Sequence, residues 1–314
     1  VLATGREFSH SATTARSASP QCEIDVGACR TAPSRCIAGG MTTNKRDDAL
    51  AGVQWDLKGQ TTYGSYLQLD RVLASQTPLS SAHDELLFIV IHQASELWMK
   101  LCLHELEGAR DQIRRDDLEP AFKMLSRVAR VQAQMIQSWE VLATMTPADY
   151  ANFRDSLGPS SGFQSHQYRL FEFLLGAKNA ALIAVHQGDP EAHARLSAAL
   201  AEPSLYDESL RLLARRGFAV PPERLERDWT KPYEPHEGVE AAWIAVYRDA
   251  EAHWDLYELG EKLVDVEYRF QQWRFAHLKT VERIIWFKRG TGGSSGVPYL
   301  ARALEAAFFP ELLT

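Results

Sequence analysis

The sequence has little cysteine, no long apolar run and no excess of basic charge, and each absence argues against a class of protein. Only four of 314 residues are cysteine, so we expect no disulfide framework, and a reducing cytoplasm suits the chain. No apolar run exceeds seven residues. A bilayer span needs about 20, so we expect no membrane segment. The net charge of −7 gives no general attraction for phosphate backbones, so we expect no nucleic-acid partner.

Residues 1–45 differ in composition from the rest of the chain. Serine, threonine, alanine, glycine and arginine dominate there, which predicts a disordered N-terminal tail followed by a single all-α domain over residues 46–314. Met41 is a candidate for the natural start of translation. Three of the four cysteines fall in this tail, seven residues apart each time, at Cys22, Cys29 and Cys36. Their spacing matches no common zinc site.

From Tyr63 onward, apolar residues recur every three or four positions, as amphipathic helices require, and no segment shows the alternation of a strand. Thr146 and Pro147 are typical of a helix N-cap and its first turn. The fold class is therefore predicted to be all-α, a helical bundle. The pattern predicts helices over residues 83–115, 118–143, 164–187, 191–200, 204–216 and 239–288, with a loop over 220–238.

Two glycine-rich segments match the nucleophile elbow of serine hydrolases, at residues 158–162 and 292–296. An elbow follows a strand, whereas a helical pattern precedes both segments, so the context disfavours a hydrolase. The phosphate-loop interpretation of residues 289–296 fails as well, because the terminal Lys and Ser/Thr of that motif are missing. The paired Glu-x-x-His ligands of di-iron bundles are absent from the helical body.

His277 lies on a helical segment that runs directly into the second glycine-rich segment. A haem ligand needs an unprotonated imidazole nitrogen in an apolar slot. Apolar side chains that could wall a porphyrin flank His277 at helical spacing: Phe270, Trp273, Val281 and Ile284. A buried histidine that serves only the core remains the alternative.

Two further pairs of residues are spaced four apart and so share a helix face. Phe88 with His92 could bracket a flat aromatic ligand, by stacking and by a hydrogen bond to a ring N–H. Tyr150 with Arg154 could bind a carboxylate, for which the arginine fork is suited. Thr291 adds a hydroxyl in the glycine-rich loop. An ordinary core pair, a solvated arginine and a flexible loop are the alternatives.

Several separated segments, in order over about residues 60–310, resemble tryptophan 2,3-dioxygenases: TYGSYLQLD (62–70), HDELLFIVIHQASELWMKL (83–101), FRDSLGPSSGFQSHQYR (153–169) and the block 277–296. The resemblance implies an all-α haem protein of the tryptophan/indoleamine dioxygenase type, a homotetramer with one haem b per subunit. It implies insertion of O2 across the indole C2–C3 bond of L-tryptophan to give N-formyl-L-kynurenine, the first step of the kynurenine pathway.

Position by position, the resemblance implies that His277 is the proximal haem ligand. His92 would be the distal, catalytic histidine that meets the indole N–H and positions the substrate. Phe88 and Tyr150 would line the indole pocket. Arg154 would bind the substrate carboxylate.

The resemblance also assigns the glycine-rich turns and the start of the helical body. Thr291 would contact the ammonium and carboxylate end of the substrate, and Ser161 and Gly162 would form the turn beside the haem. An N-terminal element would reach into the site of a neighbouring subunit, with its contacts made by Tyr63, Tyr66 and Leu67. Such a site is complete only in the assembled protein.

Two rival functions stay open on the sequence. A related haem oxygenase could act on a substituted or different indole, because Arg154 and Thr291 indicate an amino acid without specifying it. A haem sensor or carrier without turnover would keep His277 but would need neither of those two residues.

Overall fold

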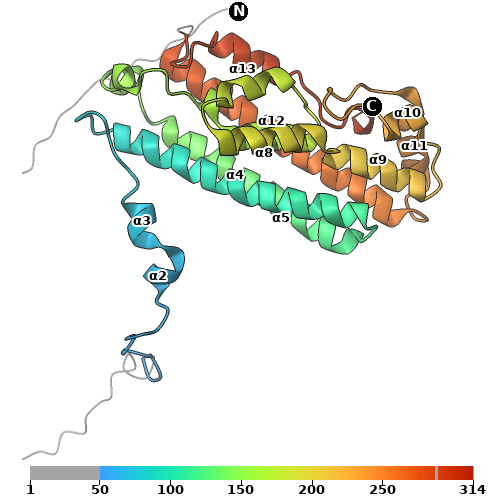
Figure 1. Cartoon of the computed structure of the whole chain (residues 1–314), viewed down its shortest axis with the longest axis horizontal. Helices are drawn as coiled ribbons and strands as arrows, with labels where there is room; N and C mark the ends of the chain where they lie inside the picture. The colour runs from blue at the N-terminus through green and yellow to red at the C-terminus, as the bar shows by residue number, and fades with distance from the viewer. Residues whose placement is uncertain (1–49, 287–288, 314) are drawn as a thin grey trace, which may run out of the picture. The chain divides into compact units, whose positions relative to one another are not determined.

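The computed structural model describes residues 50–286 and 289–313. Contacts along the chain divide it into two units, Val1–Thr62 and Tyr63–Thr314. The expectations for the tail over residues 1–45 and for Met41 lie outside the described residues. Within the described ranges every regular element is helical and none is a strand, which confirms the all-α class (Figure 1).

The helices follow one another as α2 (Tyr63–Leu67), α3 (Leu69–Leu73), α4 (Glu85–Arg114), α5 (Leu118–Leu142), α6 (Pro147–Ala151), α7 (His166–Leu175), α8 (Pro190–Ala201), α9 (Leu205–Arg215), α10 (Pro222–Leu225), α11 (Glu237–Arg248), α12 (Trp254–Ile285) and α13 (Val297–Ala303). Short 3₁₀ turns separate them, at η1 (Arg154–Leu157), η2 (Gly162–Gln164), η3 (Ala180–His186) and η4 (Pro310–Leu312).

The long helices α4, α5 and α12 form the frame of the bundle (Figure 1). Helix α5 packs against both α4 and α12, while α7 and α9 cover α4. One face of α5 is fully buried, at Ala121, Leu125, Val128 and Met135. Each such large side chain removed from water contributes about 1.5–3 kcal/mol. Because α5 touches both neighbours, it fixes the distance between residues carried on α4 and on α12.

The expected helix over residues 164–187 is wrong in its length. It breaks after α7, where Gly176 takes the left-handed conformation (φ 115°) and donates its N–H to the carbonyls of Glu172 and Phe173. The chain resumes as η3, with the Asn179 side chain accepting the N–H of Ala181. A glycine that ends a helix and an asparagine that caps the next turn are local signals, and apolar spacing alone does not reveal them.

The expected helix over residues 239–288 is also two helices. Helix α11 ends at Arg248, because Asp249 leaves the helical conformation (φ −130°, ψ 55°) and its carboxylate accepts the N–H of Ala252. Helix α12 starts at Trp254. The expected loop over 220–238 contains the one-turn helix α10. The other predicted helices are confirmed to within a few residues, and the Thr146 cap of α6 is a full capping box.

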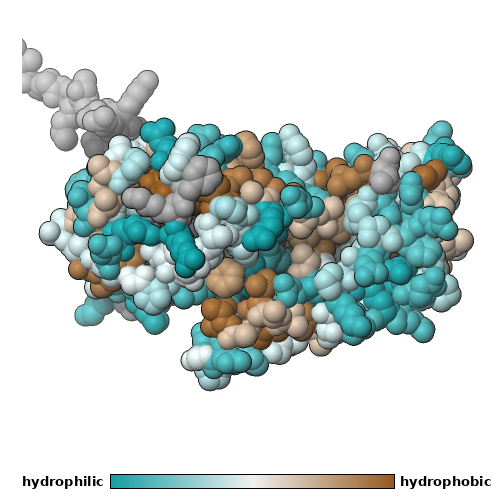
Figure 2. Space-filling model, turned by 90° about the horizontal axis from the view of Figure 1, so that it is seen from above, coloured by the Kyte–Doolittle hydropathy of each residue, from teal (hydrophilic) through white to brown (hydrophobic). Residues whose placement is uncertain are grey.

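Helix α4 is the one helix among the described residues that is long and apolar enough to span a membrane by length and composition. The sequence has no long apolar run and therefore did not predict a helix of this kind. Core helices of soluble proteins pass the same test, and α4 packs against α5, α7 and α9. Its apolar residues also reach the surface at Leu86, Val90 and Leu97. Figure 2 shows such apolar patches between polar ones on one face of the molecule.

Polar side chains of α12 hold the C-terminal segment. The buried carboxylate of Glu267 accepts the N–H groups of Phe308 and Phe309, each at 2.9 Å. Further along α12, Gln271 and Arg274 donate to backbone carbonyls of the same C-terminal segment, at 2.7 and 2.8 Å. Burial raises the pKa of Glu267, against the lowering effect of the two N–H donors. These hydrogen bonds therefore join α12, which precedes the glycine-rich loop, to the segment that follows the loop.

Candidate active site

Three helices bring two histidines to one aromatic residue. His92 lies on α4, His277 on α12 and Trp139 on α5 between them. The indole of Trp139 is stacked on the His277 ring, with centroids 4.5 Å apart and planes 7° from parallel. The same indole meets the His92 ring edge-on at 6.4 Å and 86°. The structure therefore unites the two histidines that the sequence singled out.

One hydrogen bond fixes the tautomer of His92. Its Nδ1 lies 2.7 Å from the carbonyl oxygen of Phe88, one turn earlier in α4. A carbonyl can only accept, so Nδ1 carries the proton and the neutral ring leaves Nε2 as an acceptor. Burial lowers the pKa of His92, outweighing this bond and the nearby Glu96 carboxylate. His92 is thus a neutral imidazole that can receive an N–H donor.

The ring of His277 is enclosed but still reached by solvent. Burial, followed by the proximity of His92, lowers the pKa of His277 to about 3. The residue nevertheless keeps an intermediate solvent exposure. Among the described residues no group is hydrogen-bonded to its ring nitrogens. A neutral imidazole with a free ring nitrogen is the form that binds a metal.

Aromatic side chains wall the space beside His92. Phe88 lies 4.2 Å from the His92 ring, centroid to centroid, and 5.9 Å from the ring of Tyr150. Phe153 contacts both Phe88 and Tyr150 at right angles or near them, at 5.5 and 5.3 Å. Burial raises the pKa of Tyr150, and the neighbouring Arg154 opposes that rise. The wall suits a flat aromatic ligand.

The polar end of the site is formed by Arg154 and the glycine-rich loop. Arg154 donates from one terminal nitrogen to the carbonyl of Arg289 at 2.8 Å. Its Nε is buried and has no hydrogen-bond partner among the described residues. The Thr291 hydroxyl donates to the carbonyl of Ser160. A guanidinium with a spare buried donor is suited to receive a carboxylate.

The turn over residues 158–164 packs against the glycine-rich loop. Ser161 caps η2, where its hydroxyl accepts the N–H of Phe163 at 3.3 Å. Gly292 lies so close that a Cβ there would sit 2.6 Å from the Cβ of Ser161. Only glycine permits this approach. The predicted residues Ser161, Gly162 and Thr291 are therefore brought together, with Arg154 linked to the same loop.

Three predicted residues are not brought to this cluster within the single chain. Helix α2 buries none of its residues, and exposed side chains remain at Tyr63, Tyr66 and Leu67. Conversely, the sequence analysis missed Trp139 and Phe153. Trp139 follows Met135 and Val128 on the buried face of α5. Its spacing along α5 is that of an ordinary core residue, so nothing in the sequence distinguished it from the other core residues.

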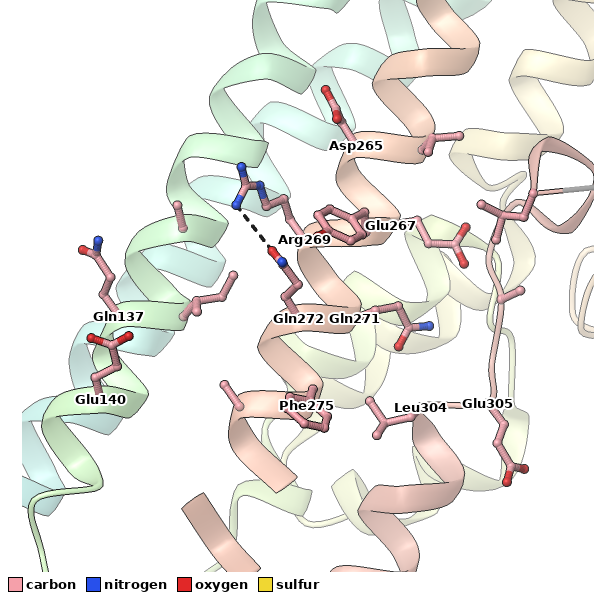
Figure 3. A pocket seen from close by; sticks show the side chains of 17 residues that line it. Gln137, Glu140, Asp265, Glu267, Arg269, Gln271, Gln272, Phe275, Leu304 and Glu305 are labelled. Carbon is pink, nitrogen blue, oxygen red and sulfur yellow. Dashed lines mark hydrogen bonds between the residues drawn. The ribbon is translucent and has the colours of Figure 1, made fainter. Parts of the chain in front are cut away.

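A large groove lies elsewhere. It measures about 1160 Å³ and lies between α5, α12 and the C-terminal segment. Figure 3 shows Gln137 and Glu140 on α5, Arg269 and Gln272 hydrogen-bonded to each other on the neighbouring α12, and Glu305 beyond α12. None of the predicted site residues lines it. Its lining offers no histidine, so the chemistry is better placed at the histidine pair than at this groove.

The residues at the histidine pair fit a haem. Among the described residues no three His, Cys, Asp or Glu side chains gather to hold a metal ion by themselves. A porphyrin provides most of the iron's ligands, so a single free imidazole in an apolar slot is what it requires. His277 offers this imidazole, beside the buried indoles of Trp139 and Trp273. The fold and the histidine pair are those expected of an all-α protein that binds haem.

Comparison with known proteins gives the family. The family model for tryptophan 2,3-dioxygenase matches residues 47–314. The chain is 64% identical to the tryptophan 2,3-dioxygenase of Erythrobacter litoralis, over 81% of this chain and 96% of that protein. It is 57% identical to the enzyme of that name from Bacillus cereus (87% and 98% covered) and 55% to that from Burkholderia pseudomallei (94% and 95%). The chain belongs to the tryptophan 2,3-dioxygenase family.

Proposed function

We propose that the histidine pair is the active centre of a tryptophan 2,3-dioxygenase, in which His277 would hold the iron of one haem b per subunit. As a member of this family, the chain oxidises L-tryptophan with O2 to N-formyl-L-kynurenine, the first step of the kynurenine pathway. The observation that carries the site assignment is the pair of neutral imidazoles from α4 and α12 that meet at Trp139.

Haem, when bound, supplies the iron and the redox chemistry that activate O2. The protein's part is to hold the indole in place. His92 Nε2 accepts the indole N–H, because the Phe88 carbonyl holds the ring proton on Nδ1. Phe88 and Tyr150 pack against the indole plane and exclude water. His92 therefore acts by positioning the substrate.

The amino acid end of the substrate would bind at the loop. The unpaired Nε of Arg154 offers a donor to the carboxylate. Thr291 contributes its hydroxyl beside the ammonium and carboxylate groups. Ser161 and Gly162 form the turn that supports both the haem and the loop.

The proposal includes a homotetramer in which the N-terminal element of one subunit completes the site of another. The exposed side chains of Tyr63, Tyr66 and Leu67 support this, because each would be covered by such a contact. It also includes a cytoplasmic location. Cys102, the cysteine that the described ranges contain, is a buried free thiol, as a reducing compartment favours.

The two histidines can be tested by one pair of variants. His277→Ala should lose haem or its normal absorption spectrum, because it removes the imidazole that would hold the iron. His92→Ala should keep haem and lower turnover by about 10- to 1000-fold, as expected for a lost positioning contact. Product formation from L-tryptophan in air, with tryptamine as a control substrate, measures the second effect. Wild-type haem spectra and turnover in His277→Ala would disprove the ligand assignment.

A further inference from the structure

We infer that Trp139 is a positioning residue that sets the orientation of the His277 ring through the stack between them. The inference rests on the proposed role of His277 as haem ligand. It concerns how this chain holds the ligand, and Trp139 itself would touch neither the iron nor the substrate through its stacked face.

The geometry singles out this contact. Trp139 and His277 are almost parallel, at 4.5 Å and 7°, whereas the other indole beside His277, Trp273, lies at 5.7 Å and is tilted by 42°. Trp139 is only 6% exposed and is braced by Trp273 at 5.7 Å. The His92 ring lies 6.4 Å from the same indole and nearly perpendicular to it. The indole is therefore a fixed surface against which the imidazole lies flat.

No hydrogen bond performs the same task in the described part of the chain. Histidines that ligate metals are usually oriented by a hydrogen bond from their second ring nitrogen to a carboxylate or carbonyl. The His277 ring has no such partner among the described residues. The Nε1 of Trp139 is also buried and unpaired there. Orientation of the ligand ring is thus left to the aromatic contact.

The stack is compatible with ligation. An imidazole coordinates through a nitrogen at its edge, so a ring on its face leaves the lone pair free. Stacking at this separation is worth more than the area it buries. It also restricts rotation about the two side-chain torsions of His277. Without the stack, this rotational freedom would be lost only when the ring binds iron, and its loss would cost entropy at that step. Trp139 would therefore pre-arrange His277 before haem binds.

The test compares Trp139→Leu, which removes the ring, with Trp139→Phe, which keeps a ring but lacks the N–H. Trp243→Leu is the matched control, because it removes a buried indole on α11 that lies against Tyr206 rather than at His277. The first readout is the NMR signal of the His277 ring in haem-free protein, where loss of the stacked ring should remove a ring-current shift. The second is the iron–histidine stretching band of the ferrous holoprotein.

We expect Trp139→Leu to broaden or shift this band and to weaken haem retention by about 10- to 100-fold, as lost orienting contacts do at metal sites. Trp139→Phe should stay close to wild type, and Trp243→Leu should keep the band position. If Trp139→Leu does not fold by circular dichroism, Trp139→Met carries the same comparison with a more adaptable side chain.

A wild-type band and wild-type haem retention in the ring-less variant would overturn the inference. Equal losses in Trp139→Phe and Trp139→Leu would overturn it too, because they would place the effect in the indole N–H. Neither result would disturb the assignment of His277. That assignment fails separately, if His277→Ala binds haem with the wild-type spectrum.

Discussion

At His92 a single bond within one helix decides which ring nitrogen faces a ligand. The Phe88 carbonyl takes the Nδ1 proton at 2.7 Å, and burial keeps the ring neutral. The spacing of Phe88 and His92 indicated that they share a face. It did not show that the backbone of the first sets the tautomer of the second, which is a property of the helix geometry.

Arg154 gives a residue-scale prediction on substrate recognition. Arg154→Lys replaces the planar fork by a point charge and removes the Nε donor. A lost hydrogen bond to a charged group costs about 1.5–3 kcal/mol, so we expect KM for L-tryptophan to rise about 10- to 100-fold. Steady-state kinetics measure this, with tryptamine as the control because it lacks the carboxylate. An unchanged KM for L-tryptophan would remove Arg154 from the substrate site.

The elements that carry the site are fixed by contacts between distant turns. The glycine-rich loop meets the turn over 158–164 through Thr291 and Ser160 and through the close approach of Gly292 to Ser161. The sequence predicted both glycine-rich segments as loops. That they pack against each other could not be predicted, because nothing in the local pattern of one refers to the other.

Gly292→Ala tests this contact between elements. The added Cβ would lie 2.6 Å from the Cβ of Ser161, so the loop must move away from the turn. Overpacking of this kind costs about 1–3 kcal/mol, and we expect a higher KM with haem still bound. Gly188→Ala is the control, since its Cβ would meet nothing within 4 Å. Wild-type kinetics in Gly292→Ala would show that closure of the loop on the turn is not required.

At the scale of the whole molecule, the proposed exchange of N-terminal elements predicts complementation. One inactive subunit carries Tyr66→Ala, with an intact histidine pair. The other carries His277→Ala, with an intact N-terminal element. Co-assembled, they should recover part of the wild-type turnover, because some sites then combine both intact parts. Light scattering gives the size of the assembly. Mixed assemblies that remain inactive would contradict action between subunits.

The stability of the molecule should depend on His186, which is 7% exposed and has an unpaired buried Nε2. Burial, then the charges of His166 and Arg169, lowers the pKa of His186, with Asp189 opposing and His193 adding to the lowering. The unfolded chain therefore binds more protons below about pH 6.5, so stability falls as the pH drops through that value toward the folded pKa.

His186 is expected to contribute less than about 1.4 kcal/mol per pH unit, because solvent screening reduces the effect of its proton. His92 and His277, whose pKa values are also lowered, add to the slope. Urea unfolding of haem-free protein across this range measures it. His186→Gln should flatten the slope, whereas His104→Gln on the exposed face of α4 should not. Equal slopes in all three proteins would show that His186 is not the group that titrates.

The sequence by itself determined the helical class, most helix positions, the family and the residues of the site that lie one turn apart. These follow from periodicity and motifs, which are local. Only the tertiary structure decided where helices break at Gly176 and Asp249, and that Trp139 lies flat on His277. Those features depend on caps and on packing between α5 and α12, because contacts between segments far apart in the chain leave no trace in the spacing of either one.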